Sequence, residues 1–202
     1  MESSQNPVIP YPAGILRIVL RAPLLLFRLG LGDVLNGLRL LVLTTRGRKS
    51  GTARHTAIEY RRHGSKIYLI SGWGNRPDWY QNLLTDPLAT VQLGRNALSV
   101  LADPVDDPAE ALRVVNLFRR NAPARYDAVL GRLIDSDISG RTLPDVSPRF
   151  TIVRLNIIPD EPTLPGLQTD KVWMWPVAVI GLFMMFVLIS RSEGRTAKDG
   201  KE

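Results

Sequence analysis

Residues 38–51 read LRLLVLTTRGRKSG, and the change from apolar to basic character inside this stretch decides the fold. Residues 38–43 form an apolar run with the length and composition of a buried β-strand. A second extended run starts at Ala57, and a third covers residues 66–71. The sequence therefore predicts consecutive antiparallel strands, the first two joined by a tight basic turn.

The predicted turn combines glycine, hydroxyl and cationic residues in a way that suits an anionic ligand. Glycine can adopt positive φ, so the chain turns tightly and backbone amides can converge on an oxygen-rich group. Arginine binds phosphate or carboxylate as a bidentate fork, and lysine acts as a point charge. The alternative is a solvated basic hairpin tip. Because the cations adjoin glycine and serine, an anion site is favoured, made of Arg48, Lys49, Ser50, Gly51 and Arg54.

The charge of the chain is concentrated in the same region. The 202 residues carry a formal net charge of +7, and residues 40–66 hold seven Lys and Arg against one acid, Glu59. Such a basic zone suggests an anionic small molecule, a nucleic acid or a lipid surface as partner. Because the sequence has no recognition-helix, zinc or paired aromatic motif, nucleic acid is not expected.

Several kinds of chemistry have no support in the sequence. There is no cysteine, which excludes disulfides, thiol catalysis and cysteine-based metal sites. The two histidines, His55 and His63, lie without an acidic cluster beside them, so no metal site is predicted. A Ser-His-Asp triad is not indicated either. The length is that of one ordinary domain with a sizeable core.

Residues 172–190 contain no charge and predict a single C-terminal transmembrane helix. As a helix this stretch would be about 28 Å long, close to the roughly 30 Å hydrocarbon core of a bilayer. Trp173 and Trp175 stand at its entrance, where aromatic rings favour the membrane interface. A buried core helix is the less favoured alternative because every face is apolar. The lipid bilayer is therefore an expected partner.

The segment 14–31 is apolar but carries Arg17, Arg21 and Arg28, which fall within about 40° of one another on a helix. Pro23 should break or kink such a helix midway. One interpretation is a helix lying in the membrane interface. The other is a helix packed on the domain with solvated arginines, and the sequence leaves both open.

The middle of the chain alternates strand and helix signals. Further strands are predicted at residues 89–93, 97–102 and 150–157, and helices at 77–84, from a cap at Asp106 or Asp107 to about 121, and at 125–134. The pattern favours an α+β fold built on a small antiparallel barrel. The expected organisation is an amphipathic segment 1–35, a cofactor-binding barrel 36–158, a linker 159–171, the transmembrane helix 172–190 and a polar tail 191–202.

Three elements in this order resemble the deazaflavin-dependent nitroreductases, a family of flavin-reductase-like split β-barrels. The first is LTTRGRKSGTAR at 43–54, similar to the family's Thr-Gly-Arg-Lys-Ser-Gly turn. The second is PDWYQNL at 77–83, after a Ser-Gly-rich turn, and the third is Asp86-Pro87 followed by VQLG at 91–94. The resemblance implies a small antiparallel split β-barrel with flanking helices.

The resemblance also implies a cofactor, coenzyme F420, whose phosphodiester and glutamate tail are anionic. The basic turn, Arg48, Lys49, Ser50, Gly51 and Arg54, would hold that tail. The deazaflavin ring would lie beside Ser71, Gly72, Trp73 and Gly74, and Trp79 and Asn82 would brace this wall. Tyr126 is the candidate residue of the acceptor pocket, where the family commonly has several tyrosines. Ala57 stands near a position where the family often has proline.

The implied function is a membrane-anchored oxidoreductase that transfers hydride from reduced F420 to a quinone, nitro compound or similar electrophile. The alternatives are a non-catalytic cofactor- or lipid-binding barrel and an FMN-dependent oxidoreductase. Positive-inside counting places the tail, with Arg191, Arg195, Lys198 and Lys201, in the cytosol. Because deazaflavin pools are cytosolic, and because no secretory signal pattern is recognised, a cytosolic main domain is nevertheless expected.

Overall fold

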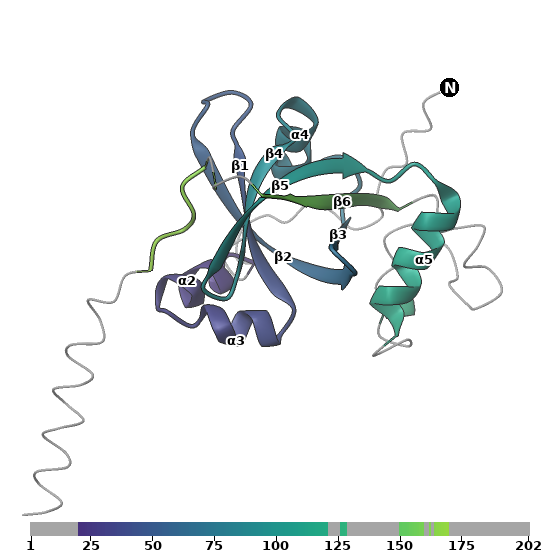
Figure 1. Ribbon diagram of the computed structural model, residues 1–202, viewed down its shortest axis with the longest axis horizontal. Helices are drawn as coiled ribbons and strands as arrows, with labels where there is room; N and C mark the ends of the chain where they lie inside the picture. The colour runs from purple at the N-terminus through teal and green to yellow at the C-terminus, as the bar shows by residue number, and fades with distance from the viewer. Residues whose placement is uncertain (1–19, 121–125, 129–149, 160–161, 163, 170–202) are drawn as a thin grey trace, which may run out of the picture.

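Six antiparallel strands close into a barrel in the order β1-β2-β3-β6-β5-β4, with helices around it (Figure 1). The computed structural model describes residues 20–120, 126–128, 150–159, 162 and 164–169. The strands are β1 Leu40–Arg46, β2 Ala53–His63, β3 Lys66–Ser71, β4 Leu88–Leu93, β5 Asn96–Pro104 and β6 Thr151–Ile158. The helices are α2 Ala22–Arg28, α3 Gly32–Gly37, α4 Asp78–Thr85 and α5 Pro108–Arg119. The α+β barrel expected from the sequence is confirmed.

Strand β1 is a continuous apolar run because both of its faces are covered. Leu41 and Leu43 point into the barrel, where they join the main core. Val42 lies on the other side of the strand and packs with Phe27 of α2 and Leu35 of α3. All three β1 side chains are at most 1% exposed. The two N-terminal helices are therefore attached to the outside of the barrel by burial of apolar surface.

Helix α5 covers another part of the barrel wall. Its buried residues Val114, Val115 and Phe118 pack against Tyr68 of β3 and Ile152 of β6. The helix begins as predicted, because the carboxylate of Asp107 accepts hydrogen bonds from the amides of the first turn at 3.1 and 3.2 Å. This cap satisfies amides that have no partner within the helix.

Between residue 20 and β1, the described part of the N-terminal region forms two short helices, α2 and α3. Pro23 lies in the first turn of α2, where its missing amide costs little, so the helix starts at the proline that was expected to interrupt it. Gly30, at φ +84°, turns the chain between α2 and α3. Strand β2 is also longer than expected: it begins at Ala53, because the ladder with β1 continues to the pair Arg46 and Ala53.

Residues expected to be a linker lie on the barrel beside β4. The side-chain amide of Gln92 bonds both to the carbonyl of Leu167, at 3.2 Å, and to its amide, at 2.7 Å. Leu164 and Leu167 are buried. Within the part of the chain that the structure describes, none of the helices is long and apolar enough to cross a membrane. The predicted span 172–190 lies outside the described residues.

Candidate functional site

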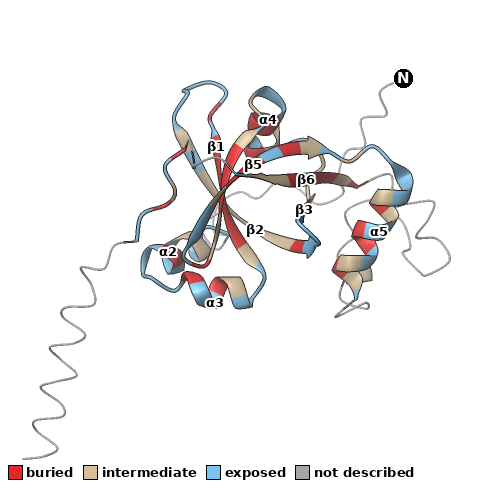
Figure 2. Ribbon diagram, viewed as in Figure 1, coloured by how far each residue is buried: buried red, intermediate tan, exposed pale blue. Residues whose placement is uncertain are grey.

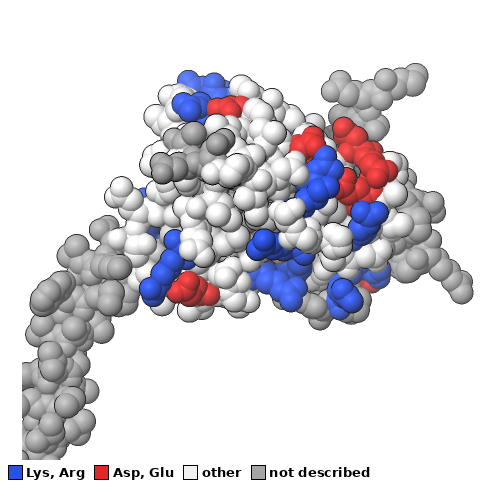
Figure 3. Space-filling view, viewed as in Figure 1, with Lys and Arg blue, Asp and Glu red and all other residues white. Residues whose placement is uncertain are grey.

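The basic turn joins β1 to β2 at one end of the barrel, next to α4 (Figure 1). Gly47 donates its amide to the carbonyl of Thr52 at 2.9 Å, and its own carbonyl accepts from Gly51 at 2.7 Å. Gly51 has φ +67°, which explains a glycine at this position. Figure 3 shows Lys and Arg gathered over this loop, at the top of that view. The turn thus has the tight geometry that its sequence predicts.

Asn82 of α4 holds the basic turn in place through two side-chain hydrogen bonds. Its side-chain oxygen accepts from the backbone amide of Arg48 at 3.1 Å, and its side-chain nitrogen donates to Thr45 Oγ1 at 3.0 Å. Asn82 is 3% exposed. The Arg48 guanidinium forms an ion pair with Asp78, at the start of the same helix, at 2.9 Å. Arg48 and Asn82 therefore connect the turn to α4, through the backbone amide and Nη1 of Arg48 and both ends of the Asn82 side-chain amide.

The groups of the turn that are available to a ligand are mainly side chains and not backbone amides. Every amide from Gly47 to Thr52, except that of Lys49, has a partner within the protein. The hypothesis of converging free amides is therefore not what the structure shows. Lys49 and Arg54 are exposed, and Arg54 donates to Ser50 Oγ at 3.3 Å. Cationic side chains on a rigid turn suit an anion that is partly solvated.

The second predicted segment lies at the same end of the barrel. The hydroxyl of Ser71, the last residue of β3, donates to the carbonyl of Gly74, which has φ +58°. Gln81 of α4 donates its side-chain amide to the carbonyl of Asn75 at 2.6 Å. Because α4 bonds both to this segment and to the basic turn, it places the two predicted parts of the cofactor site on either side of one helix.

Trp79 braces α4 from inside the barrel. It is 9% exposed and belongs to the main apolar core together with Leu83, one turn along the helix. Its ring packs edge-on against Tyr80, with the ring centroids 5.8 Å apart. Trp79 thus holds α4 through apolar packing, while the hydrogen bonds of Asn82 go to the basic turn and β1 and not to residues 71–74. Their bracing of the ring side of a cofactor stays a prediction.

Tyr126 lies away from these segments. Its hydroxyl contacts Glu59 and Arg61 near the far end of β2, and its ring packs against Phe118 of α5. Along β2, Arg54 and Arg61 are separated by seven residues, or roughly 23 Å. Burial, reinforced by the hydrogen bond with Glu59, raises the pKa of Tyr126. The structure does not bring this tyrosine together with the basic turn.

Sequence reasoning missed a histidine contact on the β1–β2 ladder. His55 Nδ1 lies 3.0 Å from the hydroxyl of the buried Thr44, its register partner. Burial, followed by the charge of Arg28, lowers the pKa of His55. The alternation of side chains along each strand could have placed Thr44 and His55 on the same face of the sheet. Only the register between β1 and β2 shows that they are directly opposite each other.

Sequence comparison identifies the family and several relatives of this chain. The model of the F420H(2)-dependent quinone reductase family matches residues 27–136. That match covers more than half of the chain and includes the basic turn, α4 and α5. The chain belongs to this family. It is a deazaflavin-dependent reductase, and its cofactor is coenzyme F420.

Individual relatives agree with this assignment. The F420H(2)-dependent quinone reductase Rv1261c of Mycobacterium tuberculosis is 30% identical over 101 residues, which cover 46% of this chain and 68% of that protein. A Mycobacterium bovis counterpart, Mb1292c, matches to the same extent. The solved structure of an F420-H2 dependent reductase, FDR-A, is 21% identical at a TM-score of 0.41, covering 59% of this chain and 94% of that one. A structural likeness at this level supports no further conclusion.

The residues present fit the anionic part of this cofactor. Lys49 and Arg54 are exposed cations on a turn whose shape is fixed by buried hydrogen bonds. When bound, reduced deazaflavin supplies a hydride, so this family member needs no side-chain nucleophile. The contribution of the protein is to bind the anionic end, orient the ring and exclude water.

Proposed function

We propose that this family member is a membrane-anchored reductase that transfers hydride from reduced F420 to a lipophilic quinone, with its barrel on the cytosolic side. The observation that carries the proposal is the basic turn held by α4, on a chain that continues into the uncharged stretch 172–190. A quinone with an isoprenoid chain resides in the bilayer, so an anchor would keep the enzyme beside its acceptor.

Two further considerations support the proposed acceptor and orientation. The relatives Rv1261c and Mb1292c are named as quinone reductases. The cofactor is anionic and water-soluble, so the basic turn must face the compartment that contains it. A cytosolic barrel requires that the polar tail 191–202 cross the membrane, contrary to the positive-inside count. Protease protection of this tail in sealed vesicles tests the orientation, and a protected barrel with an exposed tail would reverse it.

Activity is tested with the full chain in vesicles, loaded with reduced F420 and mixed rapidly with buffer that contains or lacks a long-chain quinone. Reduced deazaflavin should be oxidised in a single turnover only when the quinone is present. Lys49→Ala should slow this reaction at limiting cofactor, whereas the control Lys66→Ala, on the exposed β2–β3 turn, should not. Binding without oxidation would favour the non-catalytic alternative, and a yellow purified protein would favour FMN.

A further inference from the structure

Helices α2 and α3 carry an unusual amount of exposed apolar surface. Leu25 is 57% exposed, Val34 56% and Leu38, just after α3, 63%. Figure 2 shows much of the outer surface of these helices as exposed, at the lower left of the barrel. We call this surface the apolar shelf; it consists of Leu25, Leu26, Leu29, Leu31, Val34 and Leu38. Large contiguous apolar patches on a protein surface mark contacts with membranes or partners.

The chain leads from the barrel to the edge of this shelf. Residues 164–169 follow β4 and end beside the turn between α2 and α3, where Thr169 Cγ2 is 3.5 Å from the position of a Cβ on Gly30. The uncharged stretch begins three residues later, at Val172. Three residues span at most about 10 Å. A membrane-inserted helix starting there would therefore hold the apolar shelf close to the bilayer surface.

Next to the shelf lies a pocket of about 430 Å³ that is lined by four arginines. Tyr60, which also lines it, donates its hydroxyl to Asn36 of α3 at 2.7 Å and so joins the pocket to the helix that carries the shelf. The lining residues are Arg39, Tyr60, Arg61, Arg62, Leu117 and Arg120. In Figure 3, Lys and Arg gather along the lower edge of the molecule, between α3 and α5.

Arg61 is the buried arginine of the pocket, and its guanidinium lies over the ring of Phe118 at 4.8 Å. It is 7% exposed, and its Nε is buried without a hydrogen-bond partner among the described residues. Its terminal nitrogens are used by Glu59, Tyr126 and the Tyr60 carbonyl. Several guanidiniums around one hollow attract an anion, and Glu59 is the acid that offsets part of their charge.

We propose that the apolar shelf and the arginine pocket form one bilayer-contacting face, in which the leucines enter the interface and the guanidiniums bind the phosphate of anionic phospholipids. This rests on the proposed membrane anchoring, which brings the face to the bilayer. Apolar side chains flanked by arginines have the composition of interfacial helices. Anionic headgroups are complementary to the positive charge that the arginines place around this pocket.

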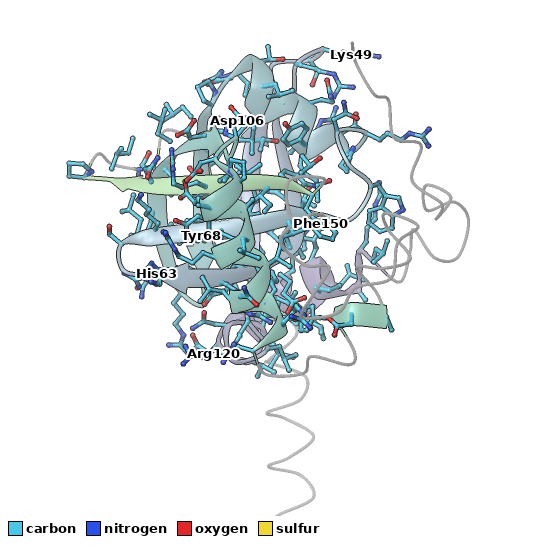
Figure 4. The ribbon with its side chains drawn as sticks, turned by 90° about the vertical axis from the view of Figure 1, so that its right-hand side faces the viewer. Lys49, His63, Tyr68, Asp106, Arg120 and Phe150 are labelled. Atoms are coloured by element: carbon cyan, nitrogen blue, oxygen red, sulfur yellow. The ribbon has the colours of Figure 1, made fainter. Side chains whose placement is uncertain are left out.

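The same face would orient the reductase. Figure 4 shows Lys49 and Arg120 at opposite ends of the molecule. With the arginine pocket on the bilayer, the basic turn points into the aqueous phase, from which the soluble cofactor comes. The lipophilic acceptor would then approach from the bilayer side of the barrel.

The test uses the absence of cysteine from the chain. Full-length Val34→Cys and Leu84→Cys are each labelled with an environment-sensitive fluorophore and reconstituted in vesicles of phosphatidylcholine and phosphatidylglycerol that contain nitroxide-labelled lipids. Leu84 is the matched control, since it is 52% exposed on α4, beside the basic turn. The probe at Val34 should be quenched severalfold more than the probe at Leu84.

The outcomes separate this inference from the proposed anchoring. Equal quenching at both positions, in protein that floats with the vesicles, overturns the bilayer-contacting face and leaves the anchor intact. Protein that does not float overturns the anchor and the face together. Energy transfer between Val34 probes on different chains, without quenching by lipid, identifies a second copy as the occupant and also overturns the inference.

The arginine pocket is tested by lipid composition. In vesicles without phosphatidylglycerol, quenching at Val34 should fall. Removing Arg62 and Arg120 by Arg62→Ala and Arg120→Ala should reduce the preference for phosphatidylglycerol by roughly fivefold per arginine. The control Lys66→Ala should keep the preference. An unchanged preference in the double variant would show that the pocket does not bind headgroups.

Discussion

The side-chain oxygen of Asn82 accepts a hydrogen bond from the backbone amide of Arg48 at 3.1 Å, across 34 positions in the chain. A residue in the barrel-facing side of α4 thereby determines the position of the basic turn. Because the side-chain nitrogen of Asn82 donates to the hydroxyl of Thr45 in β1, the turn, the strand and the helix form one unit. Rigidity of this kind reduces the entropy lost when the turn binds a ligand.

Asn82→Ala should therefore affect both stability and binding. The change leaves the buried hydroxyl of Thr45 and the amide of Arg48 without this partner, so the free energy of unfolding should fall by about 2 kcal/mol. Affinity for F420 should fall as well, because the turn is no longer fixed. Denaturant unfolding and a fluorescence titration measure the two effects. Leu84→Ala, on the exposed side of α4, is the control and should change neither.

Lys49→Ala should weaken F420 binding without changing stability. The side chain is exposed, so the folded protein loses no buried contact. One charge-assisted contact to an anion contributes on the order of 1.5–3 kcal/mol, which corresponds to an affinity loss of roughly ten- to a hundredfold. Lys66→Ala removes an equivalent charge from the β2–β3 turn and should leave the dissociation constant unchanged. Equal affinities for the wild type and Lys49→Ala would show that the cofactor binds elsewhere.

The two glycines of the basic turn should differ in their response to alanine. At Gly51 a Cβ would meet open space, but φ is +67°, so alanine costs about 1–2 kcal/mol of unfolding free energy. Asparagine tolerates this conformation, and Gly51→Asn should lose less. At Gly47 a Cβ would approach Ser50 Oγ to 2.9 Å and the Thr52 carbonyl to 3.2 Å. Gly47→Ala should therefore displace the turn and weaken F420 binding more than Gly51→Asn does.

The sequence was sufficient for the basic turn, the cap of α5 and the strands apart from the start of β2, because each depends on neighbouring residues. Leu41 and Leu43 mark a buried strand through their own spacing, and Asp107 caps the amides that follow it. The contact between Asn82 and Arg48 depends instead on how a helix lies against a strand that precedes it by more than thirty residues. The same holds for the arginine pocket, where Arg39, Arg62 and Arg120 come together through the pairing of β1 with β2 and the packing of α5 beside β2. Their spacing in the sequence gave no signal of a common site.

Glu110 should stabilise the fold at neutral pH and lose this effect in acid. Burial opposes its ionisation, but hydrogen bonds from Tyr68 at 2.8 Å and from Arg154 at 2.6 Å outweigh burial and lower the pKa of Glu110 below 4.5. Burial, together with the bond to Glu110, raises the pKa of Tyr68 to about 12, so the tyrosine remains a donor. A carboxylate with a lowered folded-state pKa stabilises above its unfolded pKa. Glu110→Gln should therefore unfold more easily at neutral pH, and its difference from the wild type should shrink below pH 4.5. Asp106→Asn, just before α5, is the exposed control.

His55 should produce an acid sensitivity at higher pH than Glu110. Burial and the charge of Arg28 lower its pKa from 6.5, so the folded state binds fewer protons than the unfolded state as pH falls through this range. Stability must then decrease below about pH 6.5, the opposite of a histidine stabilised by an acidic partner. Thermal unfolding between about pH 7.5 and pH 5 should show this decrease, and His55→Asn should reduce it. His63→Asn replaces the exposed histidine of the β2–β3 turn and should keep the wild-type dependence. If both variants follow the wild-type curve, the burial of His55 beside Arg28 does not determine the acid sensitivity of the barrel.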